Sequence, residues 1–270
     1  MGFSRLFFVV LLVISCSFTS LNAEEKTQTP LFQAHAHNDY EHARPLHDAL
    51  EHGFWSVEAD IYLVDGELLV AHDRPDVTPE RTLRKLYLDP LQAYFQKRTF
   101  FSQEKTPPFT LLVDIKTDGA AVYPILRQQL EDYAALLCRV EDGKSIPGAV
   151  QIVISGDRPK RLIAAANPRY MGIDGRLSDL GSKQPAELMP LISDRWTSHF
   201  KYRGKGSMSE VERTKLRTIV KQAHAAGRRV RFWATPESEA VWRELVAADV
   251  DHINTDQLGR LSVFLKRQAD

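Results

Sequence analysis

The sequence predicts a single domain of the (β/α)8 barrel class, on three observations. Segments typical of strands and helices alternate from residue 31 to the end of the 270-residue chain, and eight strands can be counted. Neither a shift in composition nor an internal repeat divides the chain. No glycine-rich phosphate loop follows the first strand, which argues against the alternative, an open doubly wound sheet. In a closed barrel the chemistry lies at the carboxyl ends of the strands.

Each element follows from a local pattern. Runs of β-branched and other apolar residues predict strands at residues 31–37, within 56–73, and at 110–117, 150–155, 170–174, 191–193, 229–234 and 252–255. Apolar residues at helical spacing predict helices at residues 44–52, 91–96 and 120–138, from 157 onward, at 209–227, from 235 onward and at 258–266. Gly53 ends the first helix, Ser209 caps the fifth, and Thr235 with Pro236 begins the sixth.

Residues 1–23 have the composition of an export signal. Arg5 supplies a positive charge, residues 6–14 form an apolar core too short to span a bilayer comfortably, and residues 21–23 offer a small-residue cleavage site. Alternatively the signal covers residues 1–15, because residues 13–16 resemble a bacterial lipobox, and a lipidated Cys16 would anchor the protein to a membrane. Both alternatives predict export to the periplasm, the cell surface or the medium. A polar tether at residues 24–30 then precedes the domain at 31–270.

The composition argues against some classes of function. The chain has 35 basic and 35 acidic residues, and this balance gives no support for a nucleic-acid-binding protein. Only Cys138 follows the leader, so no internal disulfide can form, and we expect Cys138 to be a small buried apolar residue. Apart from membrane anchoring, we expect a monomer.

The hairpin at residues 56–73 holds the most informative polar residues. Glu58 and Asp60 stand two apart in a strand, so both carboxylates point to one face and the apolar residues between and beside them to the other. A bound cation is the simplest partner for two buried acids that repel each other. The turn at residues 65–66 brings His72 back beside them. A tight turn puts His72 opposite Ala59, whereas a one-residue bulge puts it opposite Asp60, and the sequence leaves both open.

Other strand ends add polar residues to this group. His35 and His37 share one face of the first strand, and Asp114 and Lys116 share one face of the third. Oxygen ligands from Asp114 and the hairpin acids suit one Mg²⁺ or Ca²⁺ rather than zinc, and Asn38 is either a further ligand or a turn residue. Two histidines beside such a cation can act as acid and base near neutral pH, with Lys116 as a fixed charge for an anion.

Among the remaining candidates, His37 is preferred over His35 as the acid–base group, and His35 then shapes the pocket for the anion. Trp233, at the end of the seventh strand, is either a core residue or a platform for the substrate. A cation, a lysine and two histidines are the parts needed for phosphoryl transfer at a diester.

These residues resemble the superfamily of phosphatidylinositol-specific phospholipase C and glycerophosphodiester phosphodiesterase TIM barrels, which includes sphingomyelinase D. A first-strand histidine, a Glu-x-Asp, a second histidine and an acid on strand three form its motif, matched here by His37, Glu58 with Asp60, His72 and Asp114. Residues 37–40 are similar to the His-Asn-Thr-Tyr of eukaryotic phospholipases C, in which the asparagine binds the metal. Residues 111–117 resemble the sphingomyelinase D strand, in which the lysine contacts phosphate. Residues 232–235 and 253–256 resemble the last two strand ends of glycerophosphodiesterases.

The resemblance implies a metal-dependent phosphoric diester hydrolase of lipid metabolism, acting on glycerophosphodiesters or (lyso)phospholipid headgroups. The His-Arg-Gly and Glu-Asn-Thr motifs of glycerophosphodiesterases and the disulfide-linked loop of sphingomyelinase D are missing, which leaves the substrate open. One alternative is a two-metal amidohydrolase or polymerase-and-histidinol-phosphatase-type hydrolase, because these also begin with His-x-His. They need further histidine or lysine ligands on strands four to six, and the sequence has none there. A non-catalytic binding barrel is the other alternative.

Overall fold

The computed structural model of the chain describes residues 28–97 and 106–269. Eight parallel strands follow the order β1-β11-β10-β9-β8-β7-β4-β2, and β1 pairs with β2 to close the ring. The predicted (β/α)8 barrel is therefore confirmed. The strands are β1 (Leu31–Ala36), β2 (Phe54–Val64), β4 (Phe109–Ile115), β7 (Val150–Gly156), β8 (Met171–Gly175), β9 (Leu191–Arg195), β10 (Arg229–Trp233) and β11 (His252–Thr255).

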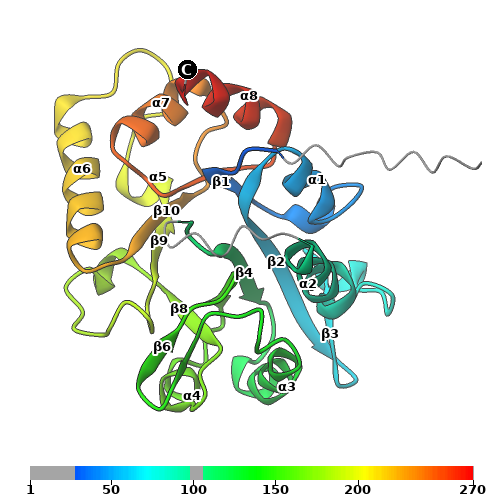
Figure 1. Cartoon of the computed structure of the whole chain (residues 1–270). Helices are drawn as coiled ribbons and strands as arrows, with labels where there is room; N and C mark the ends of the chain where they lie inside the picture. The colour runs from blue at the N-terminus through cyan, green and yellow to red at the C-terminus, as the bar shows by residue number, and fades with distance from the viewer. Residues whose placement is uncertain (1–27, 98–105, 270) are drawn as a thin grey trace, which may run out of the picture.

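Helices surround the strands (Figure 1). They are α1 (His47–Glu51), α2 (Asp89–Gln96), α3 (Gly119–Glu131), α4 (Lys160–Ala165), α5 (Trp196–His199), α6 (Glu210–Ala225), α7 (Glu239–Ala247) and α8 (Leu258–Ala269), with short 3₁₀ or π turns at Asp39–Glu41, Arg74–Asp76, Arg84–Leu88 and Leu177–Asp179. Within the described ranges, none of these helices has the length and apolar character needed to cross a membrane. The predicted export signal, with Cys16, lies outside the described residues.

An added strand, β3 (Glu67–Val70), pairs antiparallel with the far half of β2. Asp65 and Gly66 both have positive φ angles, 49° and 84°, as a tight hairpin turn requires. Val64 pairs with Glu67 across this turn. Of the two alternatives that the sequence left open, the tight two-residue turn is therefore adopted and the one-residue bulge is not. β4 pairs with one edge of β2, and β1 pairs with the first half of the opposite edge. β3 therefore pairs with the same edge as β1, farther along β2. The chain after β3 therefore returns to the end of β1.

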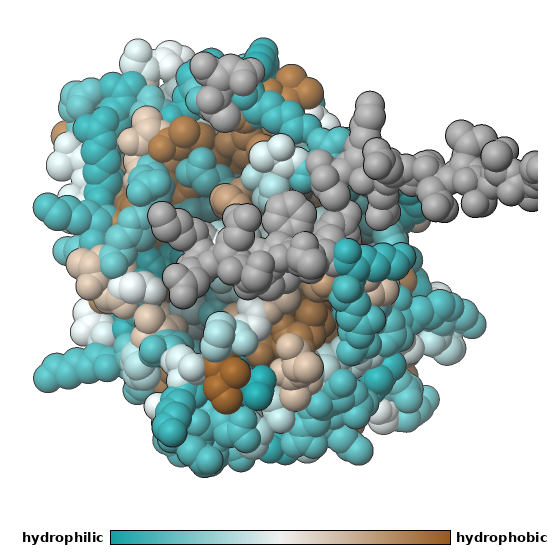
Figure 2. Space-filling view, in the orientation of Figure 1, coloured by the Kyte–Doolittle hydropathy of each residue, from teal (hydrophilic) through white to brown (hydrophobic). Residues whose placement is uncertain are grey.

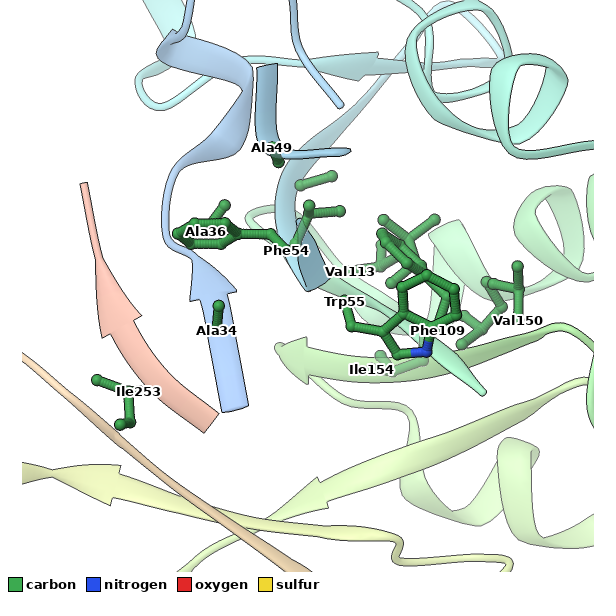
Figure 3. Close-up of a cluster of buried hydrophobic side chains, with 14 of the residues drawn as sticks. Ala34, Ala36, Ala49, Phe54, Trp55, Phe109, Val113, Val150, Ile154 and Ile253 are labelled. Carbon is green, nitrogen blue, oxygen red and sulfur yellow. The ribbon is translucent and has the colours of Figure 1, made fainter. Parts of the chain in front are cut away.

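Apolar side chains fill two regions, one on each face of the strands. Val57, Ala59 and Ile61 of β2 are fully buried between the barrel and its helices, on the face opposite the acids, as predicted. Figure 3 shows part of this main core, contributed by strands β1, β2, β4, β7 and β11 and by helix α1. A separate cluster of Leu112, Val153 and Leu191 comes from β4, β7 and β9. Since it is distinct from the outer core, we assign it to the barrel lumen, which fixes the inward face of these strands.

Two predicted elements have different limits in the structure. The helix predicted at residues 120–138 ends at Glu131, and a hairpin of β5 (Arg139–Glu141) and β6 (Lys144–Ile146) follows. The prediction was wrong because the chain after the helix packs alongside β7, where the Cys138 N–H donates to the Val150 carbonyl at 2.8 Å. The first helix begins at His47 rather than at residue 44, because Leu46 has a φ of 63°.

The predicted start of the sixth long helix was also wrong. Ser238, rather than Thr235, caps α7, and its hydroxyl accepts from the Val241 N–H at 3.3 Å. The residues before it cross to the end of β11, where the Glu237 carboxylate accepts from the Asp256 N–H at 2.9 Å. This tertiary contact delays the helix by one turn.

Large exposed hydrophobic residues are scattered over the described surface. Phe32, Leu162, Val211 and Val263 lie on four different elements. Figure 2 likewise shows mostly hydrophilic residues around the outline of one face. Isolated apolar residues of this kind are ordinary for a protein surface. The expectation of a monomer stays a prediction.

Candidate active site

The three predicted acids lie together at the carboxyl ends of β2 and β4, in the part of the barrel that we call the mouth. Asp60 and Asp114 are register partners on these adjacent strands, and Glu58 precedes Asp60 on the same face. Each acid has a carboxylate oxygen within 4.8 Å of those of the other two. Oδ1 of the buried Asp60 has no hydrogen-bond partner among the described residues. A hard divalent cation fits this oxygen set and would supply the missing partner.

Lys116 bridges two of these acids. Its Nζ lies 2.9 Å from Oδ2 of Asp60 and 3.0 Å from Oδ1 of Asp114. Burial, followed by the charge of Glu58, raises the pKa of Asp60 to about 6. A proton can therefore compete with a cation for Asp60 near pH 6, and Lys116 opposes that protonation.

Arg231 is a site residue that the sequence analysis missed. It lies on β10, across the barrel from β2, and its Nη2 donates to Oε2 of Glu58 at 2.5 Å. Its Nε donates to Asn254 of β11 at 2.8 Å. Burial raises the pKa of Glu58, but the charge of Arg231 outweighs burial and holds that pKa well below its usual range. The signal in the sequence was the period of two, which puts Arg231 on the inward face with Trp233.

His37 lies at the mouth, with one ring nitrogen on Asp256 and the other facing the acids. Its Nδ1 lies 2.7 Å from Oδ1 of Asp256, the residue after β11, so Nδ1–H donates to that carboxylate. This leaves Nε2 facing the acids, 4.0 Å from Oε2 of Glu58. Burial alone would lower the pKa of His37, but the hydrogen bond to Asp256 and the charge of Glu58 raise it above the ordinary value. His37 therefore holds its second proton more tightly than a free imidazole does.

His35 has a different environment from His37. Its ring is buried, with Nδ1 2.7 Å from the Ser56 hydroxyl and Nε2 3.5 Å from Oε2 of Glu58. Burial, followed by the charge of Arg231, lowers the pKa of His35 to about 3. This enclosed imidazole is therefore neutral, and the preference for His37 over His35 as the acid–base group stays a prediction.

His72 reaches the acids through Tyr40. His72 lies beyond the end of β3, and its Nδ1 is 3.0 Å from the Tyr40 hydroxyl and 3.5 Å from Oδ2 of Asp60. The same hydroxyl donates its proton to Oδ2 of Asp60 at 2.6 Å. The Tyr40 oxygen then accepts from Nδ1–H of His72, which leaves Nε2 of His72 free to take a proton. Tyr40 stood in the quoted motif at residues 37–40 but had no predicted role.

Asn38 lies beside this network. Its Oδ1 is 2.9 Å from the Tyr40 hydroxyl, and its backbone is left-handed, with a φ of 45°. Asparagine tolerates this conformation better than most residues do, so the turn role is met. Its Oδ1 shares the Tyr40 hydroxyl with Oδ2 of Asp60, and a role as a further oxygen ligand stays a prediction.

Trp233 ends β10 at the mouth and is half-buried. Its ring lies 5.4 Å from the guanidinium of Arg195, its register partner at the end of β9. A cation–π pair at a strand end gives a flat, partly exposed surface. Trp233 thus belongs to the mouth, and a role against substrate stays a prediction.

Comparisons with known proteins agree with the fold and identify the family of this chain. A model described as an AIM6-like phosphodiesterase domain matches residues 25–174, and a glycerophosphoryl diester phosphodiesterase family model matches residues 229–259. The fold is similar to a glycerophosphodiester phosphodiesterase from Parabacteroides distasonis, with a TM-score of 0.54 and 15% identity over 90% of this chain and all of that one.

Fungal proteins are similar in sequence. The chain is 30% identical to altered inheritance of mitochondria protein 6 of Eremothecium gossypii, over 87% of this chain and 69% of that protein. It is 29% identical to a homolog of that protein from Arthroderma benhamiae, over 83% of this chain and 81% of the other. The resemblance to phosphodiesterase barrels that the motif predicted is confirmed. This chain belongs to the family of AIM6-like phosphodiesterase domains.

Proposed function

We propose that this protein is a phosphodiesterase that uses one divalent cation and two histidines, His37 and His72. The observation that carries the proposal is the convergence of three acids between two imidazoles at the barrel mouth. Within the described ranges the converging ligand set contains Glu58, Asp60 and Asp114 and no histidine, which supports one hard cation over a pair of transition metals.

The cation would be Mg²⁺ or Ca²⁺, held by the three acids with Asn38 as a further ligand. When bound, it would neutralise charge on a nonbridging phosphate oxygen. Lys116, next to the acids, adds positive charge for the same phosphate, and His35 closes the pocket behind Glu58. Arg231 keeps Glu58 ionised and therefore ready to bind a cation.

The two histidines divide the proton transfers. Nε2 of His72 takes the proton of the attacking hydroxyl as the new P–O bond forms. Nε2–H of His37 gives its proton to the leaving oxygen as the old P–O bond breaks, which suits a histidine whose pKa is raised. A hydroxyl of the substrate next to the phosphate would give a cyclic product, and water would give a monoester.

The substrate class is a glycerophosphodiester or a (lyso)phospholipid headgroup. This proposal draws on the family match and on Trp233, which offers a flat surface beside the phosphate site. We further propose that the protein is exported, with or without a lipid on Cys16, on the basis of the composition of residues 1–23.

The test is a Glu58→Gln, Asp60→Asn double variant of residues 24–270, assayed on a panel of glycerophosphodiesters with Mg²⁺, with Ca²⁺ and with chelator. We expect turnover in the unaltered protein with one of the cations, and at least a hundredfold loss in the double variant and in chelator. Glu67→Gln removes an exposed carboxylate from the same hairpin and is the matched control. Full turnover in the double variant would refute the cation site, and stable binding without turnover would favour the non-catalytic barrel.

A further inference from the structure

Two arginines follow adjacent strands of the mouth, next to the proposed phosphate site. Arg158 lies two residues after β7, and Arg176 comes directly after β8. β7 is the neighbour of β4, and its Ser155 is the register partner of Asp114. The two arginines therefore lie at the mouth beyond Asp114, on the side of β4 that is opposite β2.

A buried carboxylate directs Arg176 over the barrel. Asp174 of β8 is fully buried, and its Oδ2 accepts from the hydroxyls of Ser155 at 2.9 Å and Ser193 at 2.6 Å. Both serines lie two residues beyond members of the lumen cluster, Val153 and Leu191, so they face inward as well. Nη1 of Arg176 donates to the same Oδ2 at 2.6 Å, which holds its guanidinium over the lumen.

Arg158 approaches the same place from β7. Its Nη1 donates to the main-chain carbonyl of Asp174, and Nη1 of Arg176 donates to that of Gly175 at 3.0 Å. The two guanidinium groups thus converge on consecutive residues at the end of β8. Burial, followed by the charge of Arg176, lowers the pKa of Arg158.

Arg158 has no direct ionic partner among the described residues. Asp174 pairs with Arg176 at 2.6 Å, and the charges of Asp174, Asp179 and Asp114 act on Arg158 only from beyond ion-pair distance. Each guanidinium uses only Nη1 for the described hydrogen bonds, so Nε and Nη2 of both remain as donors. A half-buried positive charge with free donors lacks an anionic partner.

We propose that Arg158 and Arg176 form a second anion subsite, which binds a phosphate monoester or a carboxylate carried by the substrate beyond its scissile diester. The inference rests on the proposed function and narrows its substrate class. Asp114 and Asp174 lie two strands apart, on the order of 10 Å at the usual strand spacing. A headgroup can span this distance from a phosphate held at the acids, whereas the cationic ethanolamine and choline headgroups carry no second anion and leave the subsite empty.

Two matched pairs of probes test this proposal. Glycerophosphoserine differs from glycerophosphoethanolamine by one carboxylate, and glycerophosphoinositol 4-phosphate differs from glycerophosphoinositol by one phosphate monoester. Affinities are measured by calorimetry with chelator present, for the unaltered protein, Arg158→Gln, Arg158→Lys and, as the matched control, Arg161→Gln, whose arginine is exposed on α4. This readout requires no turnover, so a protein that binds but does not cleave would count against the proposed function alone.

In one pair at least, we expect the unaltered protein and Arg161→Gln to bind the more anionic member about tenfold more tightly. The pair that shows the preference identifies the anion. Arg158→Gln should reduce the ratio of the two affinities within that pair toward one. Arg158→Lys keeps the charge and should retain part of the preference for the more anionic member. Equal or undetectable affinities in both pairs would overturn the subsite, as would a preference that Arg158→Gln leaves intact.

Discussion

The ammonium group of Lys116 lies 2.9 Å from Oδ2 of Asp60, at the acids proposed to hold the divalent cation. Lys116 and a cation bound there would therefore repel each other, although both are proposed to bind the same phosphate. In Lys116→Met we expect affinity for Mg²⁺ or Ca²⁺ to rise by about tenfold, because a like charge is removed, and turnover to fall. Calorimetry with each cation and steady-state kinetics measure the two effects. Weaker cation binding in Lys116→Met, with the exposed Lys85→Met as control, would show that Lys116 organises the acids instead.

Tyr40→Phe tests the contact between Asp60 and His72. The variant keeps the ring in the core but removes the hydroxyl that lies 2.6 Å from Asp60 and 3.0 Å from His72. We expect kcat to fall by about 10- to 100-fold with little change in KM, since His72 loses the contact that orients Nε2. Stability should drop by about 1–3 kcal/mol, as measured by denaturant unfolding. In the control, Tyr62→Phe removes a hydroxyl that, among the described residues, donates to the main-chain carbonyl of His72 and to no other group. An equal loss of kcat there would contradict this role for Tyr40.

The barrel could be predicted because its strands are short apolar runs buried on at least one face, a property that each segment carries locally. The strand predicted at residues 252–255 matches β11 residue for residue. Predictions failed where distant contacts override local preference. Glu237 contacts the end of β11 and so moves the cap of α7 to Ser238, and the chain before Cys138 leaves its helix to pack on β7.

The site residues likewise divide into those that a local sequence pattern predicts and those that depend on distant contacts. Glu58 and Asp60 share a strand, and His72 shares their hairpin, so the period of two and the turn were enough to bring them together. Arg231 contacts Glu58 across 173 residues of sequence, and no local pattern pairs these two residues. The role of Tyr40 likewise depends on the end of β1, the end of β3 and the middle of β2 meeting at one point.

The pairing of His37 with Asp256 predicts a pH dependence. The hydrogen bond to Asp256 and the charge of Glu58 raise the pKa of His37, so the protonated acid survives to higher pH and is lost as pH rises through the raised value. The alkaline limb of the kcat/KM profile should therefore lie above the ordinary histidine value of 6.5. Asp256→Asn removes the negative charge 2.7 Å from Nδ1 and should move that limb toward lower pH. The control is Asp65→Asn, at an exposed position of the hairpin turn, in which the alkaline limb should not move. If the limb does not move in Asp256→Asn either, His37 is not the acid.

Two buried histidines predict acid sensitivity of the fold. The rings of His35 and His252 lie 5.8 Å apart, and neither nitrogen of His252 has a hydrogen-bond partner among the described residues. Burial lowers the pKa of His35 to about 3 and that of His252 well below its ordinary value of 6.5. As pH falls below about 6.5, the unfolded chain binds protons at these positions and the folded protein does not.

The free energy of unfolding should therefore fall by about 1.4 kcal/mol per pH unit for each histidine. His252→Leu keeps His35 as the remaining buried histidine. The slope of its unfolding free energy against pH, between pH 6 and pH 4, should therefore be smaller by about 1.4 kcal/mol per pH unit, whatever the stability of the variant at neutral pH. Denaturant unfolding with chelator measures the slope, and His47→Leu, at an exposed position on α1, should keep the full value. An unchanged slope in His252→Leu would mean that this imidazole is protonated, and therefore paired, within the folded barrel.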